Sequence, residues 1–233
     1  MYGSITIGEK NTYTDFGLIP TARVVVATPK VKTSYVDVSG VHGLLDLSQA
    51  LTGSVLYQNC EGRWDFMAAN RYQDLRTLMH EIDNYIHGKR FRIVLEDSPS
   101  YYYMGRLEVE LGKLDRGFTR IGLKYNIEPF KYELNSSIED WLWDPFNFET
   151  GIIREYKNLT VSTSLSLTIP GSSRQCIPII TCSSAMTVTF KGQSYSLSSG
   201  ANRITAILIG EDDETLTFTG SGTVSVDYRG GWL

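Results

Sequence analysis

The chain has 233 residues, which is enough for one large β domain or for two domains of ordinary size. Residues 1–134 hold 16 basic and 16 acidic side chains, so the net charge of −4 comes from residues 135–233. No basic block is present, and the composition therefore argues against a specific nucleic-acid-binding face. The absence of a signal peptide and of a long apolar run leads us to expect folding in the cytoplasm without membrane contact.

Short segments rich in β-branched residues predict strands at the start of the chain. Val31–Val38 alternates loosely between polar and apolar residues, which is typical of a half-buried strand. Ser54–Asn59 and Arg63–Ala68 flank Glu61-Gly62, which we interpret as a hairpin turn. Two further strands are expected at Ser4–Ile7 and Arg23–Val26.

A single amphipathic helix follows these strands. Asn70 is a suitable N-cap, and Gly88 suits the left-handed residue that ends a helix. Apolar residues recur between them at spacings of three and four, which predicts a helix with one buried face. These residues are Tyr72, Leu75, Met79, Ile82 and Ile86.

Three long strands are predicted after the helix, at Lys89–Leu95, Tyr101–Leu111 and Phe118–Ile127. In Arg106–Leu111 apolar and charged residues alternate strictly, so we expect one face of this sheet to be in contact with water.

The composition changes after residue 134. Trp141, Trp143, Phe146 and Phe148 lie close together, and we interpret residues 135–150 as an aromatic connector that packs down. Serine and threonine make up 27 of the last 99 residues, against 16 of the first 134. Short strands punctuated by glycine are predicted there, at Leu165–Ile169, Met186–Phe190, Gln193–Leu197, Ile204–Ile209, Thr215–Phe218 and Thr223–Tyr228.

The predicted fold class is mainly β with one helix. We expect residues 1–134 to form a β-sandwich or split-barrel-like domain with a packed α-helix. Residues 151–233 are expected to form a small antiparallel β-sandwich of the jelly-roll or galectin-like type.

No motif for catalysis, cofactor binding or metal binding emerges, and we predict a protein that is not an enzyme. His80 and His87 lie seven residues apart, which does not match the metalloprotease spacing. The acidic run Glu211–Glu214 lacks the calcium-loop pattern and is interpreted as a solvated turn. The three cysteines, Cys60, Cys176 and Cys182, are interpreted as small buried hydrophobic residues.

The order of segments over about two thirds of the chain resembles the distal tail protein family of long-tailed bacteriophages. The resemblance is carried by Phe16–Ile19, by Asp37–Leu47, by the helix and by Gly88–Leu95 and Tyr102–Arg106. The family tends to have a Pro-Gly-x-x-Gly loop, and Ser39 replaces the proline here. The last part, ending in Arg229–Leu233, is similar to the β-sandwich that many members carry.

This resemblance implies a structural protein of the virion tail tip that is assembled in the bacterial cytoplasm. It implies a homohexameric ring, formed through the N-terminal domain, that joins the tail-tube protein to the tail-tip protein. DNA would pass through the ring only as cargo, and no cofactor is implied. A receptor-binding protein or a host glycan is a further implied partner of the outer domain.

Two sets of residues are candidates for these contacts. The loop Gly40, Val41, His42 and Gly43 is a candidate subunit contact, because two glycines allow backbones to approach closely. Trp141, Trp143 and Trp232 are candidate contacts to carbohydrate or to a partner protein.

Three other functions remain open at this point. The chain could be another ring-forming protein of the tail-tube type, although an additional C-terminal domain favours a terminal position. It could be a carbohydrate-binding module on a β scaffold, with the tryptophans as sugar platforms. An enzyme is the least favoured of the three.

Overall fold

The structure is a computed structural model that describes residues 3–50, 53–68, 75–114, 119–134, 137–138 and 155–233. Contacts divide the chain into two compact units, Met1–Lys131 with Leu233, and Tyr132–Trp232. Each unit has its own cluster of buried apolar residues. We propose that these units are the two domains expected from the sequence. The one helix that the structure describes is too short to cross a membrane.

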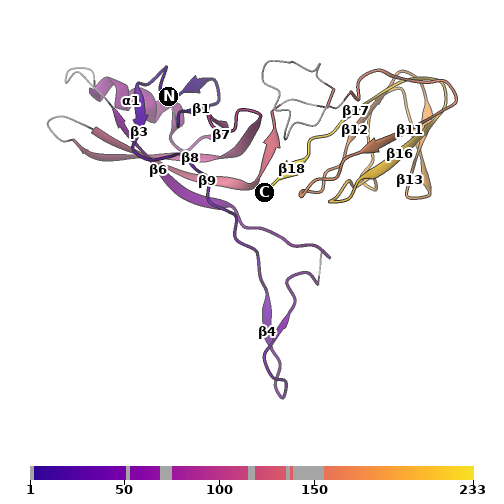
Figure 1. Cartoon of the computed structure of the whole chain (residues 1–233), viewed down its shortest axis with the longest axis horizontal. Helices are drawn as coiled ribbons and strands as arrows, with labels where there is room; N and C mark the ends of the chain where they lie inside the picture. Colours follow the sequence, from indigo (N-terminus) through magenta and orange to yellow (C-terminus); the bar gives the residue numbers. More distant parts are fainter. Residues whose placement is uncertain (1–2, 51–52, 69–74, 115–118, 135–136, 139–154) are drawn as a thin grey trace. The chain divides into compact units, whose positions relative to one another are not determined.

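The first unit is built on one antiparallel sheet, which curls strongly around its core (Figure 1). Along this sheet the strand order is β2-β1-β7-β8-β9-β6-β3. The strands are β1 (Ile5–Ile7), β2 (Lys10–Asn11), β3 (Leu18–Pro20), β6 (Cys60–Ala68), β7 (Arg90–Leu95), β8 (Tyr101–Leu114) and β9 (Thr119–Glu133). The longest described pairing runs from Cys60 opposite Ile127 to Ala68 opposite Thr119.

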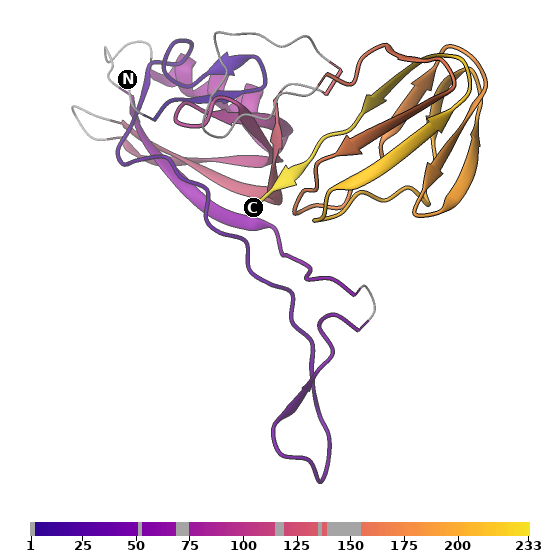
Figure 2. The ribbon, with the colours of Figure 1, turned by 45° about the vertical axis from the view of Figure 1, so that its right-hand side comes forward.

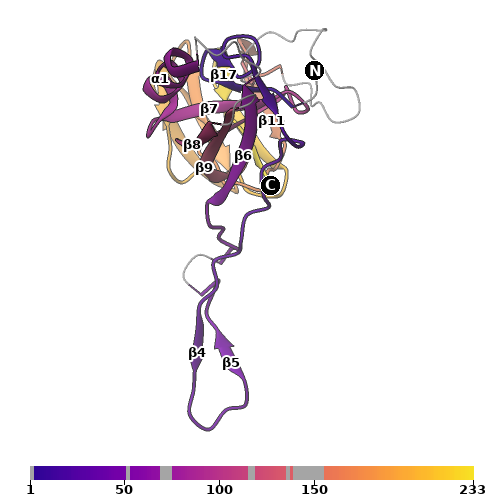
Figure 3. The same ribbon diagram turned by 90° about the vertical axis from the view of Figure 1, so that its left-hand side faces the viewer.

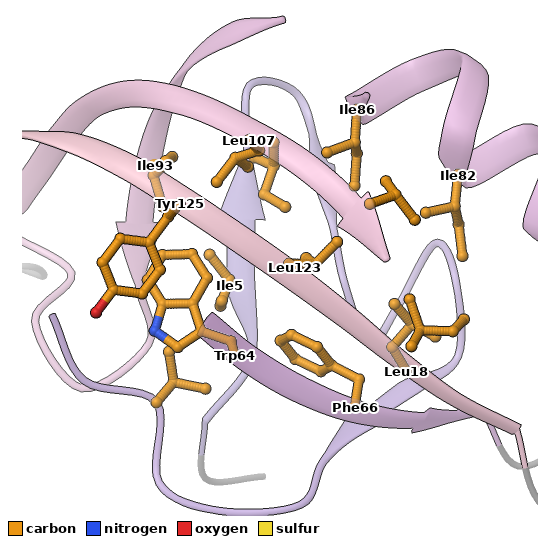
Figure 4. Packing of buried hydrophobic residues seen from close by; sticks show 14 of the residues in the cluster. Ile5, Leu18, Trp64, Phe66, Ile82, Ile86, Ile93, Leu107, Leu123 and Tyr125 are labelled. Carbon is orange, nitrogen blue, oxygen red and sulfur yellow. The ribbon is translucent and has the colours of Figure 1, made fainter. Parts of the chain in front are cut away.

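Helix α1 (Leu75–Ile86) covers the apolar face of this sheet. Met79, Ile82 and Ile86 are buried, as the spacing predicts, and Figure 4 shows Ile82 and Ile86 beside Leu107, Leu123 and Leu18. Gly88 has φ +71°, the left-handed conformation expected at the end of the helix. Asn70 and Tyr72 lie outside the described residues, and so does the side chain of Leu75.

The strands of the first unit bury alternate residues, as expected for a sheet with one wet face. On β6 the buried residues include Trp64, Phe66 and Ala68, and on β9 they include Ile121 and Leu123. Charged residues that face away from the core alternate with them, among them Arg63 and Asp65 on β6 and Arg120 and Lys124 on β9.

Two local predictions for this unit are wrong. Glu61-Gly62 is not a turn but part of β6, where the two residues pair with Asn126 and Tyr125. Continuous backbone pairing between β6 and β9 outweighs the local preference of the Glu-Gly dipeptide for a turn, because each further residue pair adds to the same row of inter-strand hydrogen bonds. Arg23–Val26 is not a strand.

Val31–Val38, expected as a half-buried strand, is exposed along its length, and only Tyr35–Asp37 forms a strand, β4. It pairs with β5 (Leu44–Asp46) in a separate two-stranded sheet. The segment does form a strand, but among the described residues no second layer covers this two-stranded sheet, so its side chains stay exposed.

The second unit contains two four-stranded antiparallel sheets, which confirms a mainly β fold with sandwich-like packing (Figure 2). Their orders are β10-β17-β12-β15 and β11-β16-β13-β14. Side chains such as Ile180, Val188, Phe218 and Val226 are fully buried in the core of this unit. The strands are β10 (Leu159–Val161), β11 (Ser164–Ile169), β12 (Ile179–Cys182), β13 (Met186–Phe190), β14 (Gln193–Leu197), β15 (Gly200–Arg203), β16 (Glu214–Thr219), β17 (Gly222–Asp227) and the short β18 (Gly231–Trp232).

The segment Ile204–Ile209 was predicted as a strand, and this is wrong. The strand in that region is β15, which ends at Arg203, while Ile207 and Ile209 are buried without belonging to a strand. Their apolar character therefore reflects burial alone, and Ile209 makes only an isolated bridge to Cys176.

Most of the predicted connector, including residues 139–150, lies outside the described residues. Ser137 is described and is only 3% exposed. Its hydroxyl donates a hydrogen bond to the carbonyl oxygen of Val226 at 2.8 Å and accepts one from the backbone N–H of Tyr228 at 2.9 Å. Ser137 therefore belongs structurally to the second unit.

We predict that Ile82→Ala destabilises the first unit by about 2–5 kcal/mol, because it removes fully buried methyl groups and leaves a cavity under α1. Denaturant-induced unfolding measures the change. His80→Ala, on the exposed side of the same helix, is the control and should change stability by less than about 0.5 kcal/mol. Equal effects of the two changes would contradict the assigned buried face.

We predict that Ser137→Ala destabilises the second unit by about 1–3 kcal/mol, because it leaves a buried N–H and a carbonyl without their shared partner. Calorimetry of the full chain should show two transitions, with Ser137→Ala lowering one and Ile82→Ala lowering the other. A single transition that both changes shift equally would mean that the two units are not separable domains.

Candidate functional site

A long two-stranded arm is the most unusual feature of the first unit. Its described part comprises residues 27–50 and 53–59 and extends away from the curled sheet, ending in the β4–β5 hairpin (Figures 1 and 3). Its two stems run antiparallel: the N–H of Lys32 donates to the carbonyl of Leu56, and that of Gln58 donates to Lys30, both at 2.7 Å. The hydrogen bond from the N–H of Leu47 to the carbonyl of Ser34 continues the ladder at the hairpin.

The predicted contact loop Gly40–Gly43 forms the tip of this arm. Gly40 and Gly43 have φ values of +86° and +83°, and a Cβ atom at either position would meet nothing within 4 Å. The glycines are therefore explained by the left-handed conformation of the turn, not by a close approach within the chain. Their role in a subunit contact stays a prediction.

The root of the arm is fastened to the core by an aromatic pair. The rings of Trp64 and Tyr125 stack with centroids 4.3 Å apart (Figure 4). Trp64 Nε1 donates to the carbonyl of Val25 at 2.8 Å, and the Tyr125 hydroxyl accepts from the N–H of Ala27 at 3.2 Å. On the returning stem, Tyr57 packs edge-on against Phe130.

Gly62 makes room for this anchor. A Cβ atom at this position would collide with the hydroxyl of Tyr125, so the ring can reach Ala27 only because residue 62 has no side chain. The glycine at position 62 is therefore explained by packing against Tyr125, and not by the turn that was predicted there from the sequence.

The described part of the arm carries an unusual amount of exposed apolar surface. Ten large apolar side chains are between 38% and 63% exposed. Large exposed apolar surface of this kind often marks an interaction site. The ten are Val31, Tyr35, Val36, Val38, Val41, Leu44, Leu45, Leu47, Val55 and Leu56.

The wet face of the curled sheet has the opposite character and is covered by interlocked charges. Arg63 contacts Asp65 at 2.9 Å and Glu110 at 2.5 Å, and Lys124 also pairs with Glu110. The hydrogen bond from Lys124, together with the charges of Lys124 and Arg63, lowers the pKa of Glu110 below its usual value. Arg90 pairs with Glu128.

A groove of about 810 Å³ runs over this face, lined by residues of β6, β7, β8 and β9. Its lining includes four cations and three carboxylates, so it presents no single sign of charge to a ligand. The four cations are Arg63, Arg90, Arg106 and Lys124. A groove with this mixed lining offers no focused field for a phosphate.

The other candidate residues are not gathered into one site. Trp141 and Trp143 lie outside the described residues. Trp232 is half-buried, and its Nε1 donates to the carboxylate of Glu133 at 3.4 Å. A carbohydrate role for these tryptophans stays a prediction.

Residues that could hold a metal do not cluster in the described part of the chain, where no group of three or more His, Cys, Asp or Glu comes together. His87 Nδ1 accepts a hydrogen bond from the N–H of Val109 at 3.1 Å, while His80 lies on the exposed side of α1. In the acidic run, Asp213 accepts a hydrogen bond from the N–H of Gly171. His87 and Asp213 thus each take part in a local hydrogen bond.

Comparison with known proteins is informative about the fold. No family model matches the chain, and no curated protein matches it significantly. Among solved structures it is similar to the Dit (gp 19.1) protein of SPP1, with a TM-score of 0.62 and 15% identity. The likeness covers 98% of this chain and 99% of the other, whose crystal structure is described as a paradigm of the hub adsorption apparatus in phages that infect Gram-positive bacteria. At this identity the comparison establishes only that the chain has a fold like that of the SPP1 protein over the part that is covered.

Proposed function

We propose that this chain is a structural protein of a bacteriophage tail tip, where it forms the hub that joins the tail tube to the adsorption apparatus. The observation that carries the proposal is the likeness in fold to a phage hub protein over nearly the whole of both chains. A likeness that includes both units is more informative than one restricted to a common β-sandwich, because β-sandwiches occur in many unrelated proteins.

The hub is a homohexameric ring in which the N-terminal unit makes the contacts between subunits. The exposed apolar arm of that unit supports such contacts, since a monomer gains nothing from displaying it to water. Identical subunits that meet head to tail close into a ring when the rotation between neighbours allows it.

The partners of the ring are the tail-tube protein on one side and a tail-tip protein on the other. The second unit carries contacts to a receptor-binding protein or to a host glycan, with Trp141, Trp143 and Trp232 as candidates. DNA passes through as cargo, and the balanced charge of residues 1–134 suits a conduit that does not retain phosphates. No step of this function requires catalysis or a cofactor.

We predict that electron cryomicroscopy of tails from the phage that encodes this chain will show six copies in one ring at the distal end. The first unit should form the ring, and the acidic run Glu211–Glu214 should point away from the channel. Tail-tube subunits in the same map provide the control, because they should recur along the whole tail. Copies of this chain along the tube, or the second unit inside the channel, would contradict the proposal.

A further inference from the structure

The end of helix α1 meets strand β8 through a short row of backbone hydrogen bonds. Just after the helix, the N–H of Gly88 donates to the carbonyl of Leu107 at 2.8 Å, and the N–H of Leu107 donates to the carbonyl of Lys89 at 3.1 Å. The regular pairing of β7 with β8 begins one residue later, at Arg90 opposite Arg106. The row therefore extends the sheet up to the last turn of the helix.

The imidazole of His87 continues this row where the backbone opposite β8 no longer can. Every second N–H of a strand points to the same side, so the next donor in the row after Leu107 is the N–H of Val109. The chain opposite has already turned into the helix, where the N–H of His87 donates to the carbonyl of Asp83 at 2.9 Å. The acceptor for Val109 is Nδ1 of the His87 side chain, at 3.1 Å. A side-chain nitrogen thus takes the place of a strand carbonyl.

This hydrogen bond fixes the protonation state of the ring. A backbone N–H only donates, so Nδ1 must carry its lone pair, and the neutral ring of His87 holds its proton on Nε2. Protonation at Nδ1 removes the acceptor and turns two N–H groups toward each other. Val109 is buried, at 8% exposed, so little water reaches its N–H as a replacement.

A second partner is in place for the protonated ring. The carboxylate of Asp83, one helical turn before His87, lies 3.6 Å from the same Nδ1. A carboxylate accepts a hydrogen bond from an imidazolium and attracts its charge, whereas a neutral nitrogen with a lone pair offers it no proton. The C-terminal end of a helix also favours a positive charge. The two protonation states of the ring therefore have different partners.

We propose that His87 is a pH-sensitive clasp that joins the end of α1 to β8. The neutral ring holds the clasp closed through Val109, and the protonated ring opens it and pairs with Asp83. Histidine side chains change charge between about pH 5 and 8, so moderate acidification opens the clasp. This inference is independent of the proposed function, because it concerns the fold of the first unit alone.

Further charged side chains lie on the elements that meet at the clasp. They are Lys89 after the helix and Arg106, Glu108 and Glu110 on β8. Lys89 and Arg106 donate to backbone carbonyls at the end of the helix, and Glu110 pairs with an arginine and a lysine on the neighbouring strands. The contact at 3.6 Å makes the carboxylate of Asp83 the partner of the imidazolium.

Opening the clasp loosens the end of the helix and leaves the rest of the first unit folded. Ile86, directly before His87, and Leu107 are fully buried and lie beside each other under the helix end (Figure 4). Opening at the end of an element requires less free energy than global unfolding. Acid therefore frees the last turn of α1, while Met79 and Ile82 still hold the helix on the sheet.

Hydrogen exchange of the full chain tests the clasp when it is read residue by residue from about pH 5 to about pH 8. After correction for the intrinsic effect of pH on exchange, we expect the amide of Val109 to lose protection by about tenfold or more at the acidic end. The amide of Leu107 is the internal control, because its acceptor is a backbone carbonyl that does not titrate.

Four variants separate the proton on the ring from the packing of the side chain. His87→Asn keeps an acceptor near the position of Nδ1 but takes up no proton, so Val109 should stay protected throughout. His87→Ala removes the acceptor, so Val109 should be unprotected throughout. Asp83→Asn removes the carboxylate that receives the protonated ring, so the loss of protection should move to lower pH. His80→Asn, on the exposed side of the same helix, is the matched control and should behave like wild type.

Protection of Val109 that is constant with pH in the wild type, or that falls equally in His87→Asn, overturns the proposal. Wild-type protection in His87→Ala at about pH 8 also overturns it, because another acceptor then serves Val109. Equal losses at Val109 and Leu107 mean that the whole junction unfolds, and they overturn the clasp as well. An unchanged transition in Asp83→Asn overturns the assignment of the carboxylate as the second partner.

Discussion

The stacked pair of Trp64 and Tyr125 is the contact on which the arrangement of the first unit depends. Both rings are buried in the core, yet the polar atom of each reaches the same short stretch of backbone at the root of the arm. Buried polar atoms of Trp and Tyr need partners: the indole N–H of Trp64 donates to the carbonyl of Val25, and the hydroxyl oxygen of Tyr125 accepts from the N–H of Ala27. One aromatic pair thus contributes apolar burial to the core and fixes the direction in which the arm leaves it.

A single sheet with one helix can bury only one face, and this constraint separates the two surfaces of the first unit. The face under α1 is filled with aliphatic and aromatic side chains, including Phe66 and Leu123 (Figure 4). The other face is in contact with water and carries ion pairs around Glu110 and Glu128. Exposed ion pairs of this kind contribute little to stability, but a charged face disfavours association with other apolar surfaces. The apolar surface available for assembly is concentrated on the arm.

The charged face of the sheet and the arm without net charge favour different kinds of contact. A sheet face with interlocked charges does not hold a polyanion that moves past it, because its cations already have carboxylate partners. In the proposed assembly, an arm without net charge would associate through burial of apolar surface, and such contacts are less sensitive to salt than ion pairs. Together they are compatible with the proposed ring, whose subunits would bind their neighbours firmly and their cargo weakly.

The sequence by itself determined the features that arise from local periodicity. The stripe from Met79 to Ile86 predicted the helix and its buried face, and the strands Met186–Phe190 and Gln193–Leu197 were placed at their observed bounds. These elements were predictable because each buries its residues against one layer, so that the apolar period equals the structural period. The resemblance to phage distal tail proteins also came from the order of such segments.

Only the tertiary structure decided where the remaining apolar residues lie. Val31–Val38 was expected as a half-buried strand, but its hairpin lies away from the core and its side chains are exposed. Gly62 read as a turn residue, but its position is explained by the hydroxyl of Tyr125, which lies more than 60 residues away in sequence. A pattern of residues indicates which side chains avoid water, and it takes long-range packing to determine whether the chain itself can cover them.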